Sequence, residues 1–256
     1  MQVSLPEGFR DSGRLIRRVT DRPPVQFQVI GERASATNLV RKLIEKNVRI
    51  DRTEALGWKH GAPHMVAIPP DFLVICVVRN AESWALSMHK RPWHAHPDLQ
   101  RLSFSRFIRA PWHGIIDRPS HFERIPAEIV DRVEGAELQL DRHPITGQRF
   151  ASLFELRRVK LAAHLGFLNR DCNLLLLRAE QVQTDPEGFV AWFSDIFGLA
   201  PRGPEFSGVT RRLGNRFRLA VREREATPEA MTPEDRAFLR AELDLDTEAA
   251  LGYTYS

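Results

Sequence analysis

The sequence predicts an α/β fold of three layers, in which helices flank a central, mostly parallel sheet. Residues 72–78 form a run of seven apolar residues rich in β-branched side chains, which is typical of a strand buried on both faces of such a sheet. Residues 25–30 alternate like a strand and lead into a helical pattern from residue 39. Strand and helix patterns keep alternating afterwards, and this order favours the α/β class.

The length and composition favour a single domain over residues 1–256. Of these 256 residues, 43% are hydrophobic, which is ample for a core. We expect residues 1–24, which carry four arginines from position 14 to position 22, to form a solvated N-terminal arm. Residues 91–125 mix aromatic, histidine and proline residues, so we expect an irregular insertion there.

The cysteines and the hydropathy indicate a cytoplasmic protein. Cys76 lies inside an apolar run and Cys172 beside another, which fits free thiols in a reducing compartment. No stretch approaches the roughly 20 apolar residues that span a bilayer, and the first residues lack the pattern of a signal peptide. We therefore expect no transmembrane segment.

The turn after the first predicted strand, residues 31–38, has the composition of a phosphate site. A strand that ends at a helix N-terminus presents unpaired backbone N–H groups and the positive end of the helix dipole to an anion. Ser35 and Thr37 would add hydroxyl donors, and Arg33 would add charge. An ordinary strand-turn-helix corner capped by a hydroxyl group is the alternative.

Polar residues recur at the ends of the next predicted elements. Lys59 and His60 stand on a turn before Gly and Pro residues, where side chains are exposed to ligands. A surface histidine is the alternative for His60. Arg79 follows the apolar strand, at the end where open α/β sheets bind ligands. Ser87, about two helical turns later, can share a face with the residues near Arg79.

The remaining pattern predicts further helices and strands. We expect a helix that ends near Asn47, an extended piece at 48–50, a helix at 81–90 capped by Asn80, a hairpin at 138–150, a helix at 152–168, a strand at 173–177, a helix at 186–197 and a last helix after Thr232.

Together these motifs resemble the P-loop sulfotransferases that use 3′-phosphoadenosine 5′-phosphosulfate. Residues 31–38 are similar to the Gly-Glu-Arg-x-Ser-Gly-Thr-Asn loop of bacterial members. The Lys-His turn, the apolar strand ending in Arg79 and the later Ser87 follow in the family's order. Residues 173–199 are similar to its late strand, Arg-Tyr-Glu-Asp-Leu segment and helix. The resemblance covers residues 25–38, 57–90 and about 155–199.

The resemblance implies a P-loop-like fold and transfer of a sulfuryl group to a hydroxyl of a carbohydrate or small metabolite, without a metal. His60 would be the general base, and Arg33 and Lys59 would supply positive charge. Residues 91–125 would form the acceptor pocket and lid. The residues implied to bind the 5′-phosphosulfate are Arg33, Ser35, Ala36, Thr37 and Asn38, and those implied to bind the 3′-phosphate are Arg79, Ser87, Arg211 and Arg212.

The chain departs from the family pattern at positions that matter for the chemistry. Ala34 stands where well-studied members have Lys, and Ala36 stands where Gly is usual and gives easy access to positive φ. Trp58 replaces a Lys two residues before the catalytic His. We expect Arg33 and Lys59 to supply the missing charge from neighbouring positions.

Two other functions compete with this interpretation. A P-loop kinase or NTPase would need the Gly-Lys-Ser/Thr ending, which is missing here. A non-catalytic nucleotide- or RNA-binding protein would use the Arg-rich surface, although we expect no nucleic-acid partner. The Arg-rich residues 211–224 also fit a solvated charge run. His94 and His96 could bind a metal, but no matching carboxylate or Cys accompanies them, so we expect none. The sequence does not indicate the oligomeric state.

Overall fold

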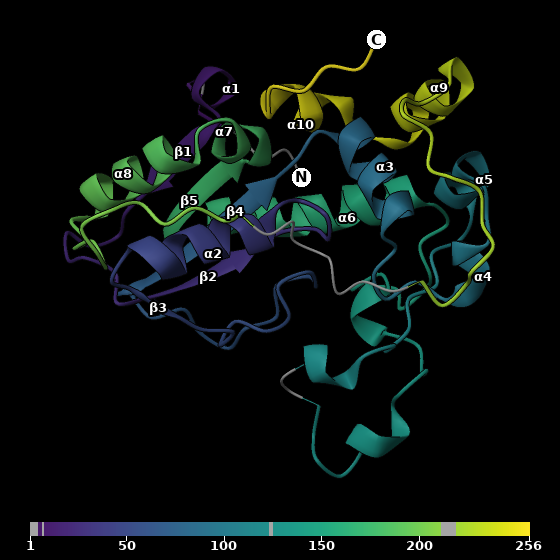
Figure 1. The fold of residues 1–256 in the computed structure, drawn as a ribbon, viewed down its shortest axis with the longest axis horizontal. Helices are drawn as coiled ribbons and strands as arrows, with labels where there is room; N and C mark the ends of the chain where they lie inside the picture. Colours follow the sequence, from purple (N-terminus) through teal and green to yellow (C-terminus); the bar gives the residue numbers. More distant parts are fainter. Residues whose placement is uncertain (1–4, 7, 123–124, 211–218) are drawn as a thin grey trace. The chain divides into compact units, whose positions relative to one another are not determined.

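The computed structural model describes residues 5–6, 8–122, 125–210 and 219–256 (Figure 1). Within them it forms an α/β fold built on one five-stranded sheet. The elements in chain order are α1 (Phe9–Ser12), β1 (Arg14–Arg17), β2 (Gln26–Ile30), α2 (Thr37–Asn47), β3 (Asp51–Arg52), β4 (Phe72–Val78), α3 (Ala81–Lys90), α4 (Pro97–Gln100), α5 (Phe104–Arg109), η1 (Pro119–His121), η2 (Val130–Arg132), η3 (Gln139–Asp141), α6 (Leu153–Leu165), η4 (Gly166–Asn169), β5 (Asn173–Arg178), α7 (Ala179–Thr184), α8 (Pro186–Phe197), α9 (Pro233–Glu242) and α10 (Leu245–Ala250).

The sheet is mixed and mostly parallel. Its strand order is β1-β5-β4-β2-β3, with β5, β4, β2 and β3 parallel and β1 antiparallel to β5. All seven residues of β4 are buried, and β4 has a parallel neighbour on each side. The predicted central strand over residues 72–78 is therefore confirmed, as are the α/β class and the mostly parallel sheet.

The antiparallel edge strand comes from the segment that the sequence suggested to be a solvated arm. Residues 14–17 pair with β5 in a register that places Arg14 opposite Leu177. The guanidinium of Arg17 donates hydrogen bonds to the carbonyls of Phe167 at 2.7 Å and Leu168 at 2.5 Å. The arginines of this segment therefore serve partly to hold backbone, a use that charge patterning alone does not reveal.

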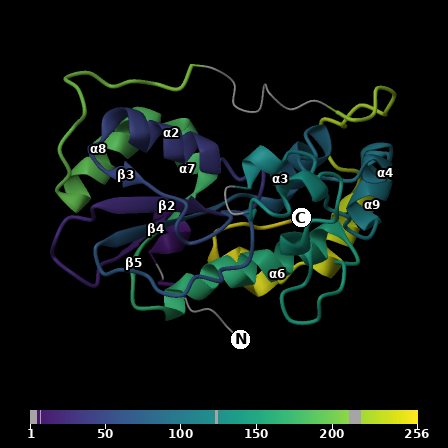
Figure 2. The same cartoon turned by 90° about the horizontal axis from the view of Figure 1, so that it is seen from below.

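The main hydrophobic core lies between the sheet and three helices. Alternate side chains of β2, β4 and β5 pack against α2, α7 and α8, and every second residue along a strand faces the same side. Figure 2 shows α2, α7 and α8 on one face of the sheet, while the C-terminal part of α6, which belongs to the first unit, lies on the opposite side. Helices therefore flank the sheet on both faces.

By contact density the chain divides into two compact units. The first contains the described residues of 1–79, 161–215 and 245–254, and the second those of 80–160, 216–244 and 255–256. The whole sheet, α2, α7 and α8 belong to the first unit, and α3, α4, α5 and α9 to the second. The single domain over 1–256 stays a prediction.

Several helices begin at the caps that the sequence predicted. The side-chain oxygen of Asn80 accepts from the amides of Glu82 at 3.0 Å and Ser83 at 3.2 Å, so α3 has the predicted bounds. Thr232 caps α9, accepting from the amide of Asp235 at 3.1 Å. The bounds of α8 and the end of α2 at residue 47 are likewise confirmed.

The hairpin predicted over residues 138–150 is wrong. A turn does form there, since the amide of His143 donates to the carbonyl of Gln148 at 2.9 Å, but a 3-10 helix replaces the first strand. The cause is Asp141, which points inward and accepts from Trp112 Nε1 at 2.9 Å and Lys160 Nζ at 2.5 Å. An alternating sequence does not reveal such a buried ion pair.

Three smaller boundaries also differ from the sequence prediction. The short strand β3 follows the predicted extended piece 48–50 rather than coinciding with it. The helix expected to run to residue 168 ends at residue 165 and continues as η4. Residues 91–125 are only partly irregular, because His96 caps α4, in which Pro97 takes the first position, and α5 follows.

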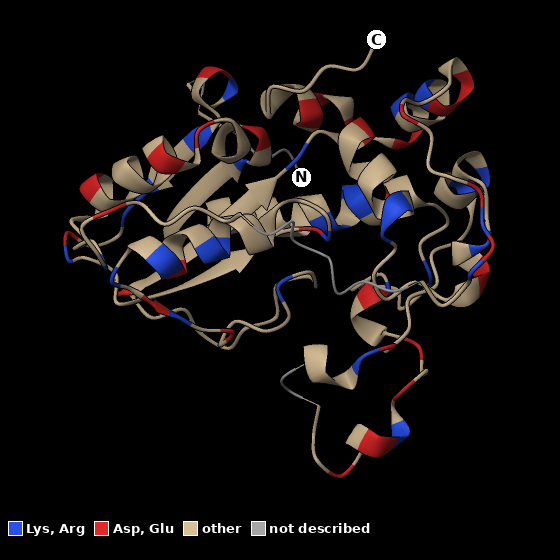
Figure 3. Ribbon diagram, viewed as in Figure 1, with Lys and Arg blue, Asp and Glu red and all other residues tan. Residues whose placement is uncertain are grey.

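Basic and acidic residues both occur along the helices of each unit (Figure 3). The longest described helix is α6 with 13 residues. None of the helices in the described part of the chain combines the length and the apolar composition that a bilayer crossing requires.

Replacing Asp141 with Ala should strongly destabilise the protein. Asp141 and Lys160 have side chains 1% and 3% exposed, so the mutation removes the carboxylate from a buried ammonium, which costs about 3–5 kcal/mol. Urea unfolding followed by circular dichroism measures the change. The control is Asp98→Ala, which removes an exposed ion pair with Arg101 and should cost less than about 1 kcal/mol. Equal losses of unfolding free energy in both variants would contradict the stabilising role of the buried pair between Asp141 and Lys160.

Candidate functional site

The candidate site begins with the loop between β2 and α2. β2 ends at Ile30 and α2 begins at Thr37, so residues 31–36 lie at the carboxyl edge of the parallel strands, where open α/β sheets bind ligands. Ala34 and Ala36 both adopt left-handed backbone conformations, with φ of 60° and 64°. The loop thus takes the turn that Gly would adopt freely, although alanines occupy these positions.

The N-terminus of α2 is the candidate anion-binding element. Ala36 is the N-cap residue, and its methyl side chain makes no capping hydrogen bond. The carbonyl of Ala36 accepts from the amides of Leu39 at 2.9 Å and Val40 at 3.1 Å. The amides of a first helical turn point out of the helix, and the helix dipole adds positive potential there, so this end of α2 is suited to a phosphate or sulfate group.

The predicted loop residues have different surroundings. Ser35 is fully buried, and its hydroxyl donates to the carbonyl of Glu32 at 2.6 Å, so it closes the loop upon itself. Thr37 is buried, whereas Asn38 is exposed at the start of α2. Arg33 is buried, and its guanidinium carbon lies 5.7 Å from the centroid of the Trp58 ring.

Arg79 joins the loop from the end of β4. Its Nη1 donates to the carbonyl of Ala34 at 2.7 Å. This bond fixes a left-handed residue of the loop to the central strand, and it places a guanidinium at the same sheet edge as the α2 N-terminus. The structure therefore brings Arg79 to the loop, as its position after the strand suggested.

Gly31 connects the loop to Lys59 and His60 by two hydrogen bonds. The amide of Gly31 donates to the carbonyl of Lys59 at 3.0 Å, and Nδ1 of His60 donates to the carbonyl of Gly31 at 2.5 Å. A carbonyl can only accept, so Nδ1 carries the proton, and in the neutral imidazole Nε2 carries the lone pair. That tautomer suits a general base.

Lys59 reaches the first turn of α2. Its ammonium donates to the side-chain oxygen of Asn38 at 2.6 Å. Burial, and then the nearby charge of Arg41, lower the pKa of Lys59 to about 8. The amine is therefore close to its titration point near neutral pH, and an anion at the α2 N-terminus would favour the charged form.

Two buried polar residues that the sequence analysis missed support this segment. Gln28, in β2, accepts from the amide of Leu56 at 2.8 Å and donates to the carbonyl of Gly57 at 2.7 Å. His164, in α6, donates from Nε2 to the carbonyl of Gly61 at 3.0 Å. A glutamine between apolar residues of a strand and a histidine on a largely apolar helix were the available signals.

Other predicted site residues lie elsewhere or outside the described residues. Ser87 lies in α3, in the second unit, and its pairing with Arg79 stays a prediction. Arg211 and Arg212 lie outside the described residues. His94 and His96 diverge, since His94 Nδ1 contacts Asp117 Oδ1 at 2.5 Å whereas the His96 ring stacks on His113 with centroids 4.3 Å apart. In the described ranges no group of three or more His, Cys, Asp or Glu could hold a metal ion.

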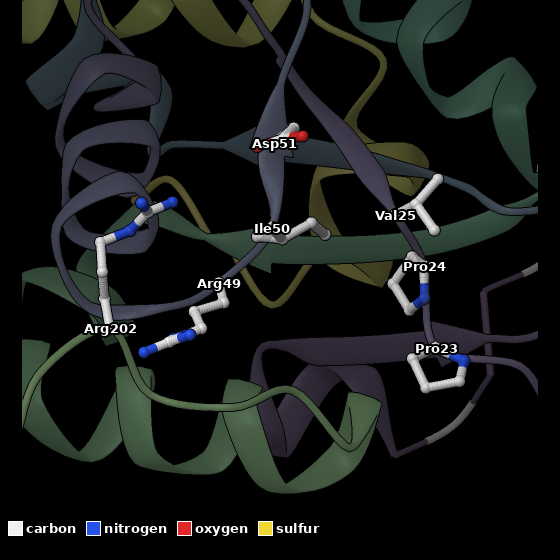
Figure 4. Close-up of a pocket in the computed structure, with 7 residues that line it drawn as sticks. All are labelled: Pro23, Pro24, Val25, Arg49, Ile50, Asp51 and Arg202. Carbon is white, nitrogen blue, oxygen red and sulfur yellow. The ribbon is translucent and has the colours of Figure 1, made fainter.

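A recess of about 590 Å³ lies at the opposite, amino ends of β2 and β3. Figure 4 shows Arg49 and Arg202 on one side of it and Pro23, Pro24 and Val25 on the other. Both arginines donate a hydrogen bond from Nε to a backbone carbonyl. Arg49 donates to the carbonyl of Pro201 at 3.1 Å, and Arg202 donates to the carbonyl of Val48 at 3.3 Å. Since parallel sheets bind ligands at their carboxyl ends, the loop at residues 31–38 is the better candidate site.

In comparisons with known proteins, no family model, no curated protein and no solved structure matches this chain. Its function must therefore be argued from the geometry of the loop and of the residues bonded to it.

Replacing Ala36 with Gly should stabilise the protein by about 0.5–1 kcal/mol, because Gly relieves the left-handed strain and is the better N-cap residue. Urea unfolding measures the change. The matched control is Ala162→Gly, on the exposed face of α6, which should destabilise by about 1 kcal/mol. A loss of stability in both variants would rule out the strain at residue 36.

Proposed function

We propose that this protein is a cytoplasmic sulfotransferase of bacterial type with a P-loop-like fold. It transfers the sulfuryl group of 3′-phosphoadenosine 5′-phosphosulfate to an acceptor hydroxyl of a carbohydrate or small metabolite. The proposal joins the resemblance of the motifs to the local geometry, in which an anion-binding helix N-terminus and a histidine of suitable tautomer belong to one hydrogen-bonded unit.

The bond from His60 Nδ1 to the carbonyl of Gly31 is the observation that carries the proposal. The same glycine begins the loop that leads to α2, so the imidazole is held beside the place where the phosphosulfate would bind. A general base must lie within hydrogen-bond reach of the proton it removes, and a fixed backbone anchor provides this.

In the proposed reaction, His60 Nε2 accepts the proton of the acceptor hydroxyl while its oxygen attacks the sulfur. The bond between sulfur and the bridging phosphate oxygen breaks, and its electron pair leaves with 3′-phosphoadenosine 5′-phosphate. The leaving phosphate gains negative charge, which the α2 N-terminus and the ammonium of Lys59 are placed to stabilise. Arg79 and Ser87 would hold the 3′-phosphate, with Arg211 and Arg212 as further candidates.

Residues 91–125 are the proposed acceptor region. Within the second unit, the guanidinium carbon of Arg118 lies 4.7 Å from the centroid of the Trp93 ring. The centroids of the Trp93 and His121 rings lie 5.7 Å apart. Aromatic faces beside polar groups suit a sugar or an amphiphilic alcohol.

The rival functions have less support. A kinase or NTPase would need a phosphate loop that ends in Gly-Lys-Ser/Thr, and this loop does not. Lys59 does reach the same helix end, but from another segment. An RNA-binding surface needs arginines that face a phosphate backbone. Several arginines of the first unit instead donate to backbone carbonyls, among them Arg17, Arg18, Arg49 and Arg178.

Calorimetry should show that 3′-phosphoadenosine 5′-phosphate binds at least about tenfold more tightly than ATP or adenosine monophosphate. Arg79→Ala should weaken that binding about 10–100-fold, since it removes charge-assisted hydrogen bonds to a phosphate. Arg49→Ala, at the amino edge of the sheet, is the matched control and should bind normally. Equal or absent binding of the three nucleotides would overturn the proposal and favour a rival.

The same ligand separates binding from chemistry at His60. His60→Ala should retain affinity for 3′-phosphoadenosine 5′-phosphate and lose about 10²–10⁴-fold in transfer of labelled sulfuryl groups to a panel of monosaccharides and simple alcohols. An unchanged rate would remove His60 from the mechanism.

The affinity for 3′-phosphoadenosine 5′-phosphate should fall as the pH rises through about 8, where Lys59 loses its proton in the free protein. The bound anion favours the charged amine, so deprotonation opposes binding, by up to about tenfold per pH unit. Lys59→Met should bind more weakly and with no pH dependence between pH 7 and 9, whereas Lys46→Met, at the other end of α2, should behave like wild type. A flat wild-type profile would contradict the role of Lys59.

A further inference from the structure

The segment that carries His60 is held at both of its ends by hydrogen bonds. On one side, the amide of Gly31 donates to the carbonyl of Lys59 and the carbonyl of Gly31 accepts from His60 Nδ1. On the other side, the carbonyl of Gly61, the residue after His60, accepts from Nε2 of His164 at 3.0 Å. A further bond from the amide of Gly61 to the carbonyl of Trp58 at 3.0 Å tightens the turn.

His164 is well suited to be a fixed support. It lies at the end of the 13-residue helix α6 and is 1% exposed, and Gly61 is buried as well. Because the carbonyl of Gly61 can only accept, Nε2 of His164 carries a proton. If this donor were removed, the buried carbonyl would lose its hydrogen bond, unless the turn moved to find another donor.

We propose that His164 is a positioning residue for His60. By donating to the carbonyl of Gly61, His164 keeps the turn in the position at which Nδ1 of His60 can donate to the carbonyl of Gly31. This bond in turn keeps the proton on Nδ1 and the lone pair on Nε2. The inference rests on the proposed function for its catalytic consequence, but the tautomer of His60 can be measured whether or not the protein transfers a sulfuryl group.

The test compares two substitutions of His164 with different hydrogen-bonding ability. His164→Phe keeps a ring of similar shape and removes the donor, whereas His164→Gln keeps an N–H donor at a comparable reach. His64→Phe is the matched control, because His64 is exposed and its Nδ1 bonds only locally, to the carbonyl of Ala62 at 2.9 Å.

Nitrogen-15 NMR of the histidine side chains gives the first readout. Wild type, His164→Gln and His64→Phe should show His60 protonated on Nδ1 at neutral pH, whereas His164→Phe should show a mixture of tautomers. If His164→Phe does not fold, His164→Asn provides the comparison, because its shorter side chain keeps the amide but does not reach the carbonyl of Gly61. An unchanged Nδ1 tautomer in the variant that folds would overturn the proposal.

Kinetics give the second readout. His164→Phe should lower kcat about 10–100-fold, because misplacement of a catalytic group by about 1 Å has an effect of this size. KM for 3′-phosphoadenosine 5′-phosphosulfate and affinity for 3′-phosphoadenosine 5′-phosphate should change less than about twofold, and His164→Gln should recover most of kcat. Equal kcat in wild type and His164→Phe, or equal losses in the Phe and Gln variants, would overturn it. If wild type transfers no sulfuryl group, the proposed function fails and the tautomer still decides the role of His164.

Discussion

The two backbone hydrogen bonds of Gly31 are the constraint on which the candidate site depends. Its amide and its carbonyl are both used by the Lys59–His60 turn, so the loop and the imidazole cannot move independently. A Cβ atom at residue 31 would also lie 2.5 Å from the carbonyl oxygen of Val77, on β4. The position therefore requires Gly, and this single residue brings together β2, β4 and the turn that carries the candidate base.

The rest of the loop has a strained backbone, and hydrogen bonds from Arg79 and Ser35 stabilise that conformation. A left-handed Ala costs on the order of 1 kcal/mol relative to Gly, and the loop contains two of them, at positions 34 and 36. The bond from Arg79 to the carbonyl of Ala34 fixes one from outside, and the bond from the Ser35 hydroxyl to the carbonyl of Glu32 closes the loop from within. A left-handed residue next to helical backbone turns successive N–H groups toward one side, as in anion-binding nests. Strained residues of this kind cluster at ligand-binding sites, which makes the loop a candidate for one.

The regular elements could be predicted from sequence because their causes are local. β4 is a run of apolar residues, and α3 and α9 begin at caps whose partners lie two or three residues away. The failed hairpin at 138–150 and the missed supports of the site share a different cause. Asp141 is bonded to Lys160, 19 residues on, and His164 to Gly61, 103 residues away. The hydrophobic pattern of a sequence does not reveal the partner of a buried polar group when that partner is distant in sequence.

For the proposed reaction, Arg33 and Lys59 are the two candidates for the positive charge that Ala34 does not supply. Arg33 is buried with its guanidinium against the Trp58 ring, which makes a T-shaped contact with the ring of His60. Arg33 therefore packs against the segment that carries the candidate base. The ammonium of Lys59 lies at the first turn of α2, 2.6 Å from the side chain of Asn38, and its burial lowers its pKa. A poorly hydrated cation gains more from an incoming anion than a well hydrated one, because it has less solvation to lose. We infer that, in the proposed reaction, Lys59 rather than Arg33 stabilises the leaving phosphate.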